Sequence, residues 1–237
     1  GISFDGTGLG DDGHIWGGEF LVCDIKEYQR KYHFEYIPIP GGDKVSKEPW
    51  RMAVSYLYTF LGKDFLQLDL PFLKNISAGN LELMMAAMDN KINTPLTSSA
   101  GRLFDAIAAL LNICTHSTFH AEAPMRLEAA VQDGIKESYP FTYKNNSISF
   151  EEMFKKIKQD LKNDILINII ATKFHNTIVS VIFETAKKMK EESGINKVVL
   201  SGGVFQNKYL IEKSMEILKQ NNFEVYTPCE FPANDGG

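Results

Sequence analysis

Lys197-Val-Val-Leu-Ser-Gly-Gly-Val-Phe-Gln-Asn207 leads into Lys208-Tyr-Leu-Ile-Glu-Lys-Ser-Met-Glu-Ile-Leu218, and together they predict a strand, a glycine turn and a helix. The β-branched run 198–200 is typical of a buried strand, and Gly202-Gly203 turns the chain. Apolar residues then recur at helical spacing, at Leu210, Ile211, Met215 and Leu218. Backbone N–H groups of such a turn, beside a helix N-terminus, can bind a phosphate. The alternative is an ordinary strand–helix turn in which the glycines only make the bend.

The composition is that of an ordinary globular protein, with 44% hydrophobic and 23% charged residues in a chain of 237. This length suits one large domain, or one domain with an inserted subdomain. The net charge of −5 disfavours nucleic acid as a partner, which would require a basic face. Cys23, Cys114 and Cys229 lie far apart, so they form neither a zinc knuckle nor a disulfide framework.

Nothing in the sequence indicates export or a membrane span, because no apolar run is long enough and no secretory signal is visible. Together with the unpaired cysteines, this predicts a cytoplasmic protein without a membrane partner. The chain has no initiator methionine and stops on Gly236-Gly237. We therefore expect it to be a piece of a longer protein.

Residues 1–42 predict an antiparallel β-meander, with strands over 2–8, 15–22 and 31–39. The first strand runs into the glycine-rich turn Asp5-Gly6-Thr7-Gly8, which carries one carboxylate. Phosphate-binding domains of the sugar-kinase and actin kind use such a hairpin, with an acidic residue at the end of the first strand. The alternative is a plain meander in which Asp5 caps the turn.

Residues 43–164 are mainly helical, with helices expected over 49–62, 79–88, 100–111, 122–132 and 151–162. The hydroxyl run Thr97-Ser98-Ser99 suits the N-cap of the third helix. Gly101 and Asp105 share one face of that helix, so a ligand ring could rest on Gly101 while Asp105 accepts from a ribose hydroxyl. The alternative is close packing at Gly101 and a surface position for Asp105.

The remaining predicted elements are a strand pair over 139–143 and 148–150, a long helix over 165–192, and a last strand over 223–226. His116 and His120 have a spacing that could hold a metal on a helix, but the hydroxyl-rich segment around them favours a loop. His175, on the long helix, is predicted to be structural. The chain ends in an acidic, glycine-rich loop over 229–237.

Six blocks carry a family resemblance through their order along the chain. They are Asp5-Gly-Thr-Gly8, Trp16-Gly-Gly-Glu-Phe20, Glu48-Pro-Trp-Arg-Met-Ala53, Ser98-Ser-Ala-Gly-Arg-Leu-Phe-Asp105, Ser201-Gly-Gly-Val-Phe-Gln-Asn207 and Asn234-Asp-Gly-Gly237. The sequence resembles the carbamoyltransferase domain of the HypF family, which acts in [NiFe]-hydrogenase maturation. It is also similar to the wider threonylcarbamoyl- and carbamoyltransferase group. The resemblance implies an α/β fold of the ASKHA (actin-like ATPase, ribonuclease H-like) type, incomplete here. Residues 43–164 would be a helical insertion, and residues 165–237 the α/β nucleotide-binding portion.

The resemblance further implies an enzyme in which carbamoyl phosphate and ATP give a carbamoyl-adenylate. Its carbamoyl group would pass to the C-terminal cysteine of the partner HypE and become cyanide on the hydrogenase iron. Asp5 and Asp235 would be catalytic carboxylates that bind a divalent metal, either Fe, Zn or Mg. The residues implied in binding phosphate or nucleoside are Gly6, Thr7, Gly8, Gly101, Asp105, Gly202, Gly203 and Asn207.

The sequence also departs from the family pattern. The family's two other metal ligands, a His-x-x-x-His pair, precede the Asp-Gly-Thr-Gly block and are not in this sequence, so we expect the fragment to be inactive alone. Where relatives have Tyr-Glu-Gly, this chain has Phe119-His120-Ala121. One alternative is an O-carbamoyltransferase of small-molecule biosynthesis or a tRNA threonylcarbamoyltransferase. Another, of a different class, is a non-catalytic nucleotide-binding or docking module.

Overall fold

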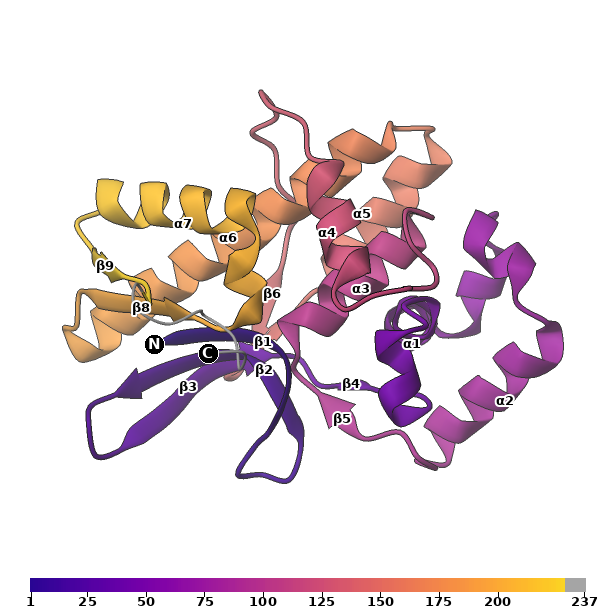
Figure 1. Ribbon diagram of the computed structural model, residues 1–237, viewed down its shortest axis with the longest axis horizontal. Coiled ribbons are helices and arrows are strands. Elements are labelled where there is room, and N and C mark those ends of the chain that lie inside the picture. The colour runs from indigo at the N-terminus through magenta and orange to yellow at the C-terminus, as the bar shows by residue number, and fades with distance from the viewer. Residues whose placement is uncertain (229–237) are drawn as a thin grey trace.

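The computed structural model describes residues 1–228 and has an α/β fold built on a mixed sheet. The hairpin strands β1 (Ile2–Leu9), β2 (Ile15–Cys23) and β3 (Tyr28–Phe34) are antiparallel, as the meander prediction required. On the other side of β1, β8 (Lys197–Ser201) and β9 (Glu224–Tyr226) run parallel to it (Figure 1). β1 therefore joins the two parts of the sheet, with β2 and β3 of the meander on one side and β8, the strand of the glycine turn, on the other.

The predicted extent of the third strand, residues 31–39, is wrong. β3 ends at Phe34, and Tyr36 turns its hydroxyl toward Asp12 and Arg30, with 2.8 Å between the hydroxyl and Arg30 Nη1. The short strand β4 (Ile37–Pro38) then pairs with β5 (Leu96–Thr97). Because β3 pairs with β2 and β4 pairs with β5, they are two separate strands, where the sequence pattern predicted one.

The seven α-helices of the described residues start and end close to the predicted positions. They are α1 (Trp50–Leu61), α2 (Ala78–Asp89), α3 (Ala100–Leu110), α4 (Glu122–Ala129), α5 (Glu151–Lys162), α6 (Ile167–Ser193) and α7 (Lys208–Gln220). The hairpin of β6 (Thr142–Lys144) and β7 (Ser147–Ser149) joins β3 at the sheet edge. Short 3-10 turns link several elements: η1 (Gly42–Ser46), η2 (Gly62–Gln67), η3 (Pro71–Asn75) and η4 (Gly203–Gln206).

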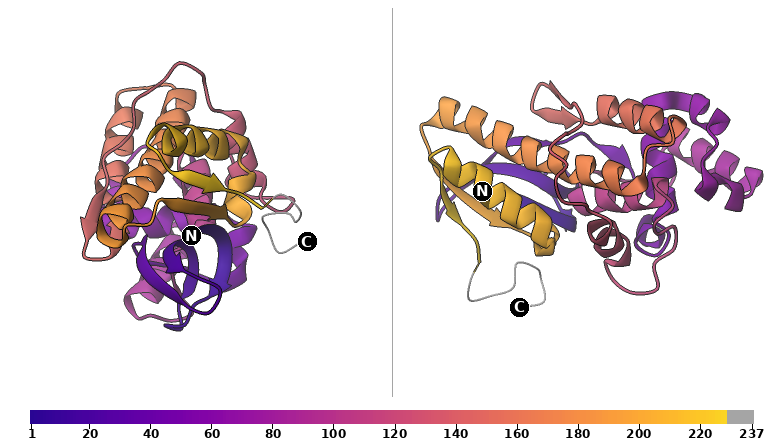
Figure 2. Two further views of the ribbon diagram at one scale, coloured as in Figure 1. Left: turned by 90° about the vertical axis from the view of Figure 1, so that its left-hand side faces the viewer. Right: turned by 90° about the horizontal axis from the view of Figure 1, so that it is seen from above.

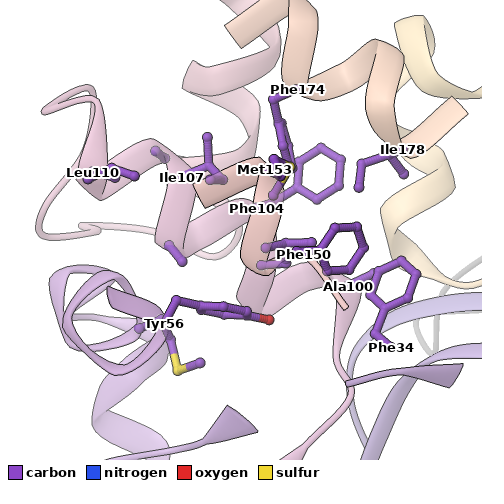
Figure 3. Packing of buried hydrophobic residues seen from close by; sticks show 14 of the residues in the cluster. Phe34, Tyr56, Ala100, Phe104, Ile107, Leu110, Phe150, Met153, Phe174 and Ile178 are labelled. Carbon is purple, nitrogen blue, oxygen red and sulfur yellow. The ribbon is translucent and has the colours of Figure 1, made fainter. Parts of the chain in front are cut away.

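α3 lies at the centre of the hydrophobic core. All of its residues except Arg102 are buried. The Phe104 ring meets Phe174 of α6 edge-on at 4.8 Å, and Phe34 of β3 meets Phe150 at the same distance (Figure 3). One cluster of buried side chains thus joins the helices of residues 43–164 to the sheet.

α6 and α7 lie side by side along one face of the molecule (Figure 2). In the part of the chain that the structure describes, none of the helices combines the length and apolar character needed to cross a bilayer.

Candidate functional site

The Asp5-Gly6-Thr7 segment forms a β-bulge inside β1. Phe4 pairs with Gly18, and the next pairing joins Gly8 to Trp16, so three residues of β1 lie opposite one residue of β2. The glycine-rich turn predicted at residues 5–8 is wrong, because these residues stay within β1. The chain reverses between Gly10 and His14, where the sequence Asp11-Asp12-Gly13 is a turn signal. A bulge re-aims side chains and frequently lies beside an active site.

The hydroxyl of Ser99 holds the bulge from the side of α3. Ser99 Oγ lies 2.8 Å from the carbonyl oxygen of Asp5 and 2.6 Å from that of Gly6. The same oxygen accepts a hydrogen bond from Arg102 N at 3.1 Å and so caps α3, as the sequence predicted. One side chain therefore fixes both the helix start and the backbone of the bulge.

Three glycines from distant parts of the chain lie close to the backbone of residues 4–6. A Cβ atom on Gly17 would lie 3.1 Å from the Asp5 carbonyl carbon, and one on Gly101 would lie 3.0 Å from Gly6 Cα. A Cβ on Gly202 would lie 2.6 Å from the Phe4 carbonyl carbon, and Gly202 also has a φ of 102°, which favours glycine. The bulge, the first turn of α3 and the turn after β8 thus form one compact region.

The carboxylate of Asp5 is half-buried, and its Oδ1 accepts a hydrogen bond from Gly6 N at 2.7 Å. Within residues 1–228 there is no group of three or more His, Cys, Asp or Glu side chains that could hold a metal ion. A single carboxylate does not make a divalent metal site, so these residues alone do not fit a metal. The second predicted ligand, Asp235, lies outside the described residues, as do its neighbours in the terminal block.

Asp105 and Arg102 form a buried pair on the first turns of α3. Asp105 is 3% exposed, so the alternative of a surface position is wrong. Arg102 Nη2 lies 3.0 Å from Asp105 Oδ2, yet no hydrogen bond joins the two atoms, and Arg102 Nε and Asp105 Oδ2 both lack a hydrogen-bond partner within residues 1–228. Burial raises the pKa of Asp105 to about 6, although the positive charges of Arg102 and His120 lower it in part. The ion pair therefore leaves Arg102 Nε as a buried donor without a partner within residues 1–228, beside the bulge.

The first turn of α7 is already capped by side chains of the chain itself. Asn207 Oδ1 accepts from Leu210 N at 2.8 Å. The Glu128 carboxylate of α4 accepts from Lys208 N at 2.7 Å and from Tyr209 N at 3.3 Å. A phosphate at these amides, as the strand–turn–helix pattern allowed, is therefore excluded while Glu128 stays in place. The Gly202-Gly203 turn remains the candidate anion site of this segment.

Sequence reasoning missed Arg102, Glu128 and the exact role of Asn207. The three-residue spacing from Arg102 to Asp105 was a usable signal, because such residues neighbour each other on a helix. Glu128 gave none, since it lies 80 residues before the amide that it caps.

His116 and His120 lie on an exposed loop before α4, as predicted. Ala121, which follows, has a φ of 59°, a conformation that favours glycine.

Comparisons with known proteins agree over the whole chain. Residues 1–237 match the family model described as carbamoyltransferase, Kae1-like domain, second subdomain. The chain is 36% identical to the carbamoyltransferase HypF of Synechocystis sp. and 35% identical to the probable carbamoyltransferase HypF of Methanocaldococcus jannaschii. Each alignment covers 100% of this chain, and 32% and 31% of the two relatives. A crystal structure of full-length HypF in a phosphate- and nucleotide-bound form superposes with a TM-score of 0.92 and 37% identity, over 99% of this chain and 37% of that one. The chain thus spans about a third of the length of these relatives.

Proposed function

Because the chain belongs to the HypF carbamoyltransferase family, as the second subdomain of its Kae1-like domain, we propose that it forms part of a carbamoyl-transfer site. The observation that carries the proposal is the meeting of three sequence motifs at the Asp5 bulge. Ser99 and Gly101 of the α3 start lie against its backbone, and Gly202 after β8 lies against the backbone of Phe4, which precedes it. Backbone contacts and short side chains hold this region rigidly, which suits a site whose groups must be in place before the substrate reacts.

The proposed substrate is a carbamoyl-adenylate made from carbamoyl phosphate and ATP. This mixed anhydride is anionic, so its site needs backbone donors and exclusion of water. We propose that Gly6, Thr7, Gly8 and the Gly202-Gly203 turn face its phosphate, and that Asp105 lies at its nucleoside. The expectation that a ligand ring rests on Gly101 is wrong, because the Gly6 backbone occupies that place, and Gly101 instead lets α3 approach β1. The phosphate- and nucleotide-bound form of the full-length relative supports a nucleotide as ligand. Asn207 would act by holding the turn, since its amide caps α7.

The proposed acceptor is the C-terminal cysteine of HypE. Its thiolate sulfur would attack the carbamoyl carbon, forming a C–S bond while the C–O bond to the phosphate breaks and AMP leaves. Asp5 and Asp235 would be two of the ligands of the family's divalent metal, which also needs ligands other than those in residues 1–228. That metal would neutralise the phosphate charge when bound. A free thiolate acceptor needs a reducing compartment, which is why we propose the cytoplasm.

Transfer to a tRNA or to a small-molecule hydroxyl, and a non-catalytic docking role, are the alternatives. The match to HypF relatives over the full chain favours the HypE acceptor over the other two. The buried Arg102–Asp105 ion pair, whose Arg102 Nε has no hydrogen-bond partner within residues 1–228, favours a ligand site over a docking surface.

The test uses the full-length protein that contains this chain, with carbamoyl phosphate, ATP and HypE. Mass spectrometry of HypE follows formation of the thiocarboxamide. We expect Asp5→Asn to slow the transfer by about a hundredfold or more, because it removes the negative charge of the Asp5 carboxylate from the proposed reaction site. The melting temperature should stay unchanged, since the Asn side chain can still accept from Gly6 N.

The matched control is Asp64→Asn, the same chemical change at an exposed carboxylate in η2. It should transfer carbamoyl at the wild-type rate. Wild-type protein that leaves HypE unmodified would refute the proposed function. Transfer by Asp5→Asn at the wild-type rate would remove Asp5 from the site.

A further inference from the structure

His175, in the middle of α6, is completely buried yet makes polar contacts through both ring nitrogens. Nδ1 lies 2.8 Å from the carbonyl oxygen of Ala171, and Nε2 lies 3.0 Å from Asn207 Nδ2. A carbonyl oxygen can only accept, so Nδ1 carries the proton and Nε2 accepts from the Asn207 amide. Burial lowers the pKa of His175 to about 4, which keeps the ring neutral near pH 7.

The contact with His175 determines how the Asn207 side chain lies. Its Nδ2 donates to His175 while its Oδ1 accepts from Leu210 N, so both ends of the amide are in use. Asn207 directly follows η4, the turn that begins at Gly203. Within η4, Phe205 stacks on Phe4 at 5.3 Å with an interplanar angle of 8°, and Phe4 precedes Asp5. The His175–Asn207 contact therefore fixes the far end of a turn that packs on the bulge.

The His175 ring also meets α3. It lies edge-on to Phe104 at 5.4 Å, and Phe104 lies between the Ser99 cap and Asp105. Tyr209 of α7 meets another side of the ring at 5.7 Å. His175 thus contacts both α3 and the segment that follows the Gly202-Gly203 turn.

Packing alone accounts for the ring contacts but not for the choice of histidine. An aliphatic side chain would fill the same volume and avoid burying polar nitrogens. It would also leave the Asn207 amide without an acceptor in a buried place, which is costly.

We propose that His175 is a positioning residue for the carbamoyl-transfer site, which acts through Asn207 to hold the Gly202–Gln206 turn against β1. The inference rests on the proposed function. It predicts that loss of the acceptor at residue 175 impairs substrate binding even where the fold is retained.

The test compares three variants of the full-length protein: His175→Leu, His175→Gln and Asn207→Ser. Leucine removes the acceptor, and we expect it to raise the KM for ATP about tenfold. The glutamine amide oxygen can still accept from Asn207, so His175→Gln should keep the KM within about threefold of wild type. Serine at position 207 retains the cap of α7 but lacks the N–H donor, so Asn207→Ser should raise the KM as His175→Leu does.

A double-mutant cycle tests whether the two residues act together. If His175 acts through Asn207, adding His175→Leu to Asn207→Ser should change the KM no further. The control is His116→Leu, at an exposed histidine, which should behave as wild type.

Multiplicative effects in the double variant would overturn the inference, and so would a His175→Leu variant that melts earlier with an unchanged KM. If His175→Leu does not fold, the inference still fails should Asn207→Ser show a wild-type KM. A wild type without transfer activity refutes the proposed function and the inference together, whereas an active wild type with indifferent variants refutes the inference alone.

Discussion

Burial acts on Asp105 and His175 in opposite directions. It raises the pKa of Asp105 to about 6, although Arg102 and His120 oppose the change, and it lowers the pKa of His175 to about 4, although the Ala171 carbonyl opposes it. Both side chains are therefore neutral in the folded protein near pH 5. In the unfolded chain both are charged at that pH.

The two groups should have opposing effects on stability between pH 4 and 6. The contribution of Asp105, whose folded pKa is raised, is present below about pH 4 and is lost as the pH rises to about 6. The contribution of His175, whose folded pKa is lowered, is present above about pH 6.5 and is lost as the pH falls to about 4. Each shift corresponds to about 3 kcal/mol, so the sum of these two contributions to the free energy of unfolding should change little in this window.

Single variants should separate the two contributions. Relative to wild type, Asp105→Asn should lose free energy of unfolding as the pH falls from 6 to 4, whereas His175→Gln should gain it. Urea titration at each pH measures both slopes. Parallel curves for the two variants would contradict the assignment of these groups.

Among the elements, α2 and α3 begin with the same three residues in different surroundings. Ser77-Ala78-Gly79 and Ser99-Ala100-Gly101 each provide a serine N-cap and a glycine in the first turn. A Cβ on Gly79 would meet nothing within 4 Å, whereas one on Gly101 would meet the backbone of Gly6. The glycine of α3 is therefore required by the approach of the helix to β1.

This pair gives a matched prediction. Gly79→Ala should stabilise the protein by up to about 1 kcal/mol, because alanine has the higher helix propensity. Gly101→Ala should destabilise it by about 1–3 kcal/mol, because the new methyl group must displace the bulge. Chemical denaturation measures both changes. Stabilisation by both substitutions would mean that α3 does not press on β1.

The helices and most strands could be predicted from local patterns, because apolar spacing and turn residues act within a few positions. The bulge at Asp5 could not be predicted, because an Asp-Gly-Thr-Gly segment suits a turn equally well. Whether it forms a turn or a bulge depends on how β1 pairs with β2. For Asp105 the sequence left two alternatives open. Burial of a carboxylate depends on the elements packed around α3, which no local pattern encodes.

Over the whole molecule, the candidate site is shared by segments far apart in the sequence. Residues 1–42 supply the bulge, the central helix α3 supplies its cap, and the segment after β8 supplies the glycine turn. A common hydrophobic core fixes these parts relative to one another. The order of the motifs, more than any one of them, predicted that they belong to one site.

Hydrogen–deuterium exchange of the full-length protein tests this convergence most directly, with and without a non-hydrolysable ATP analogue. We predict slower exchange on nucleotide addition in three segments of this chain together, residues 4–8, 98–105 and 201–207. Residues 78–89 of α2 should be unaffected. Protection confined to α2, or unchanged exchange in all three segments while nucleotide is bound, would contradict the account.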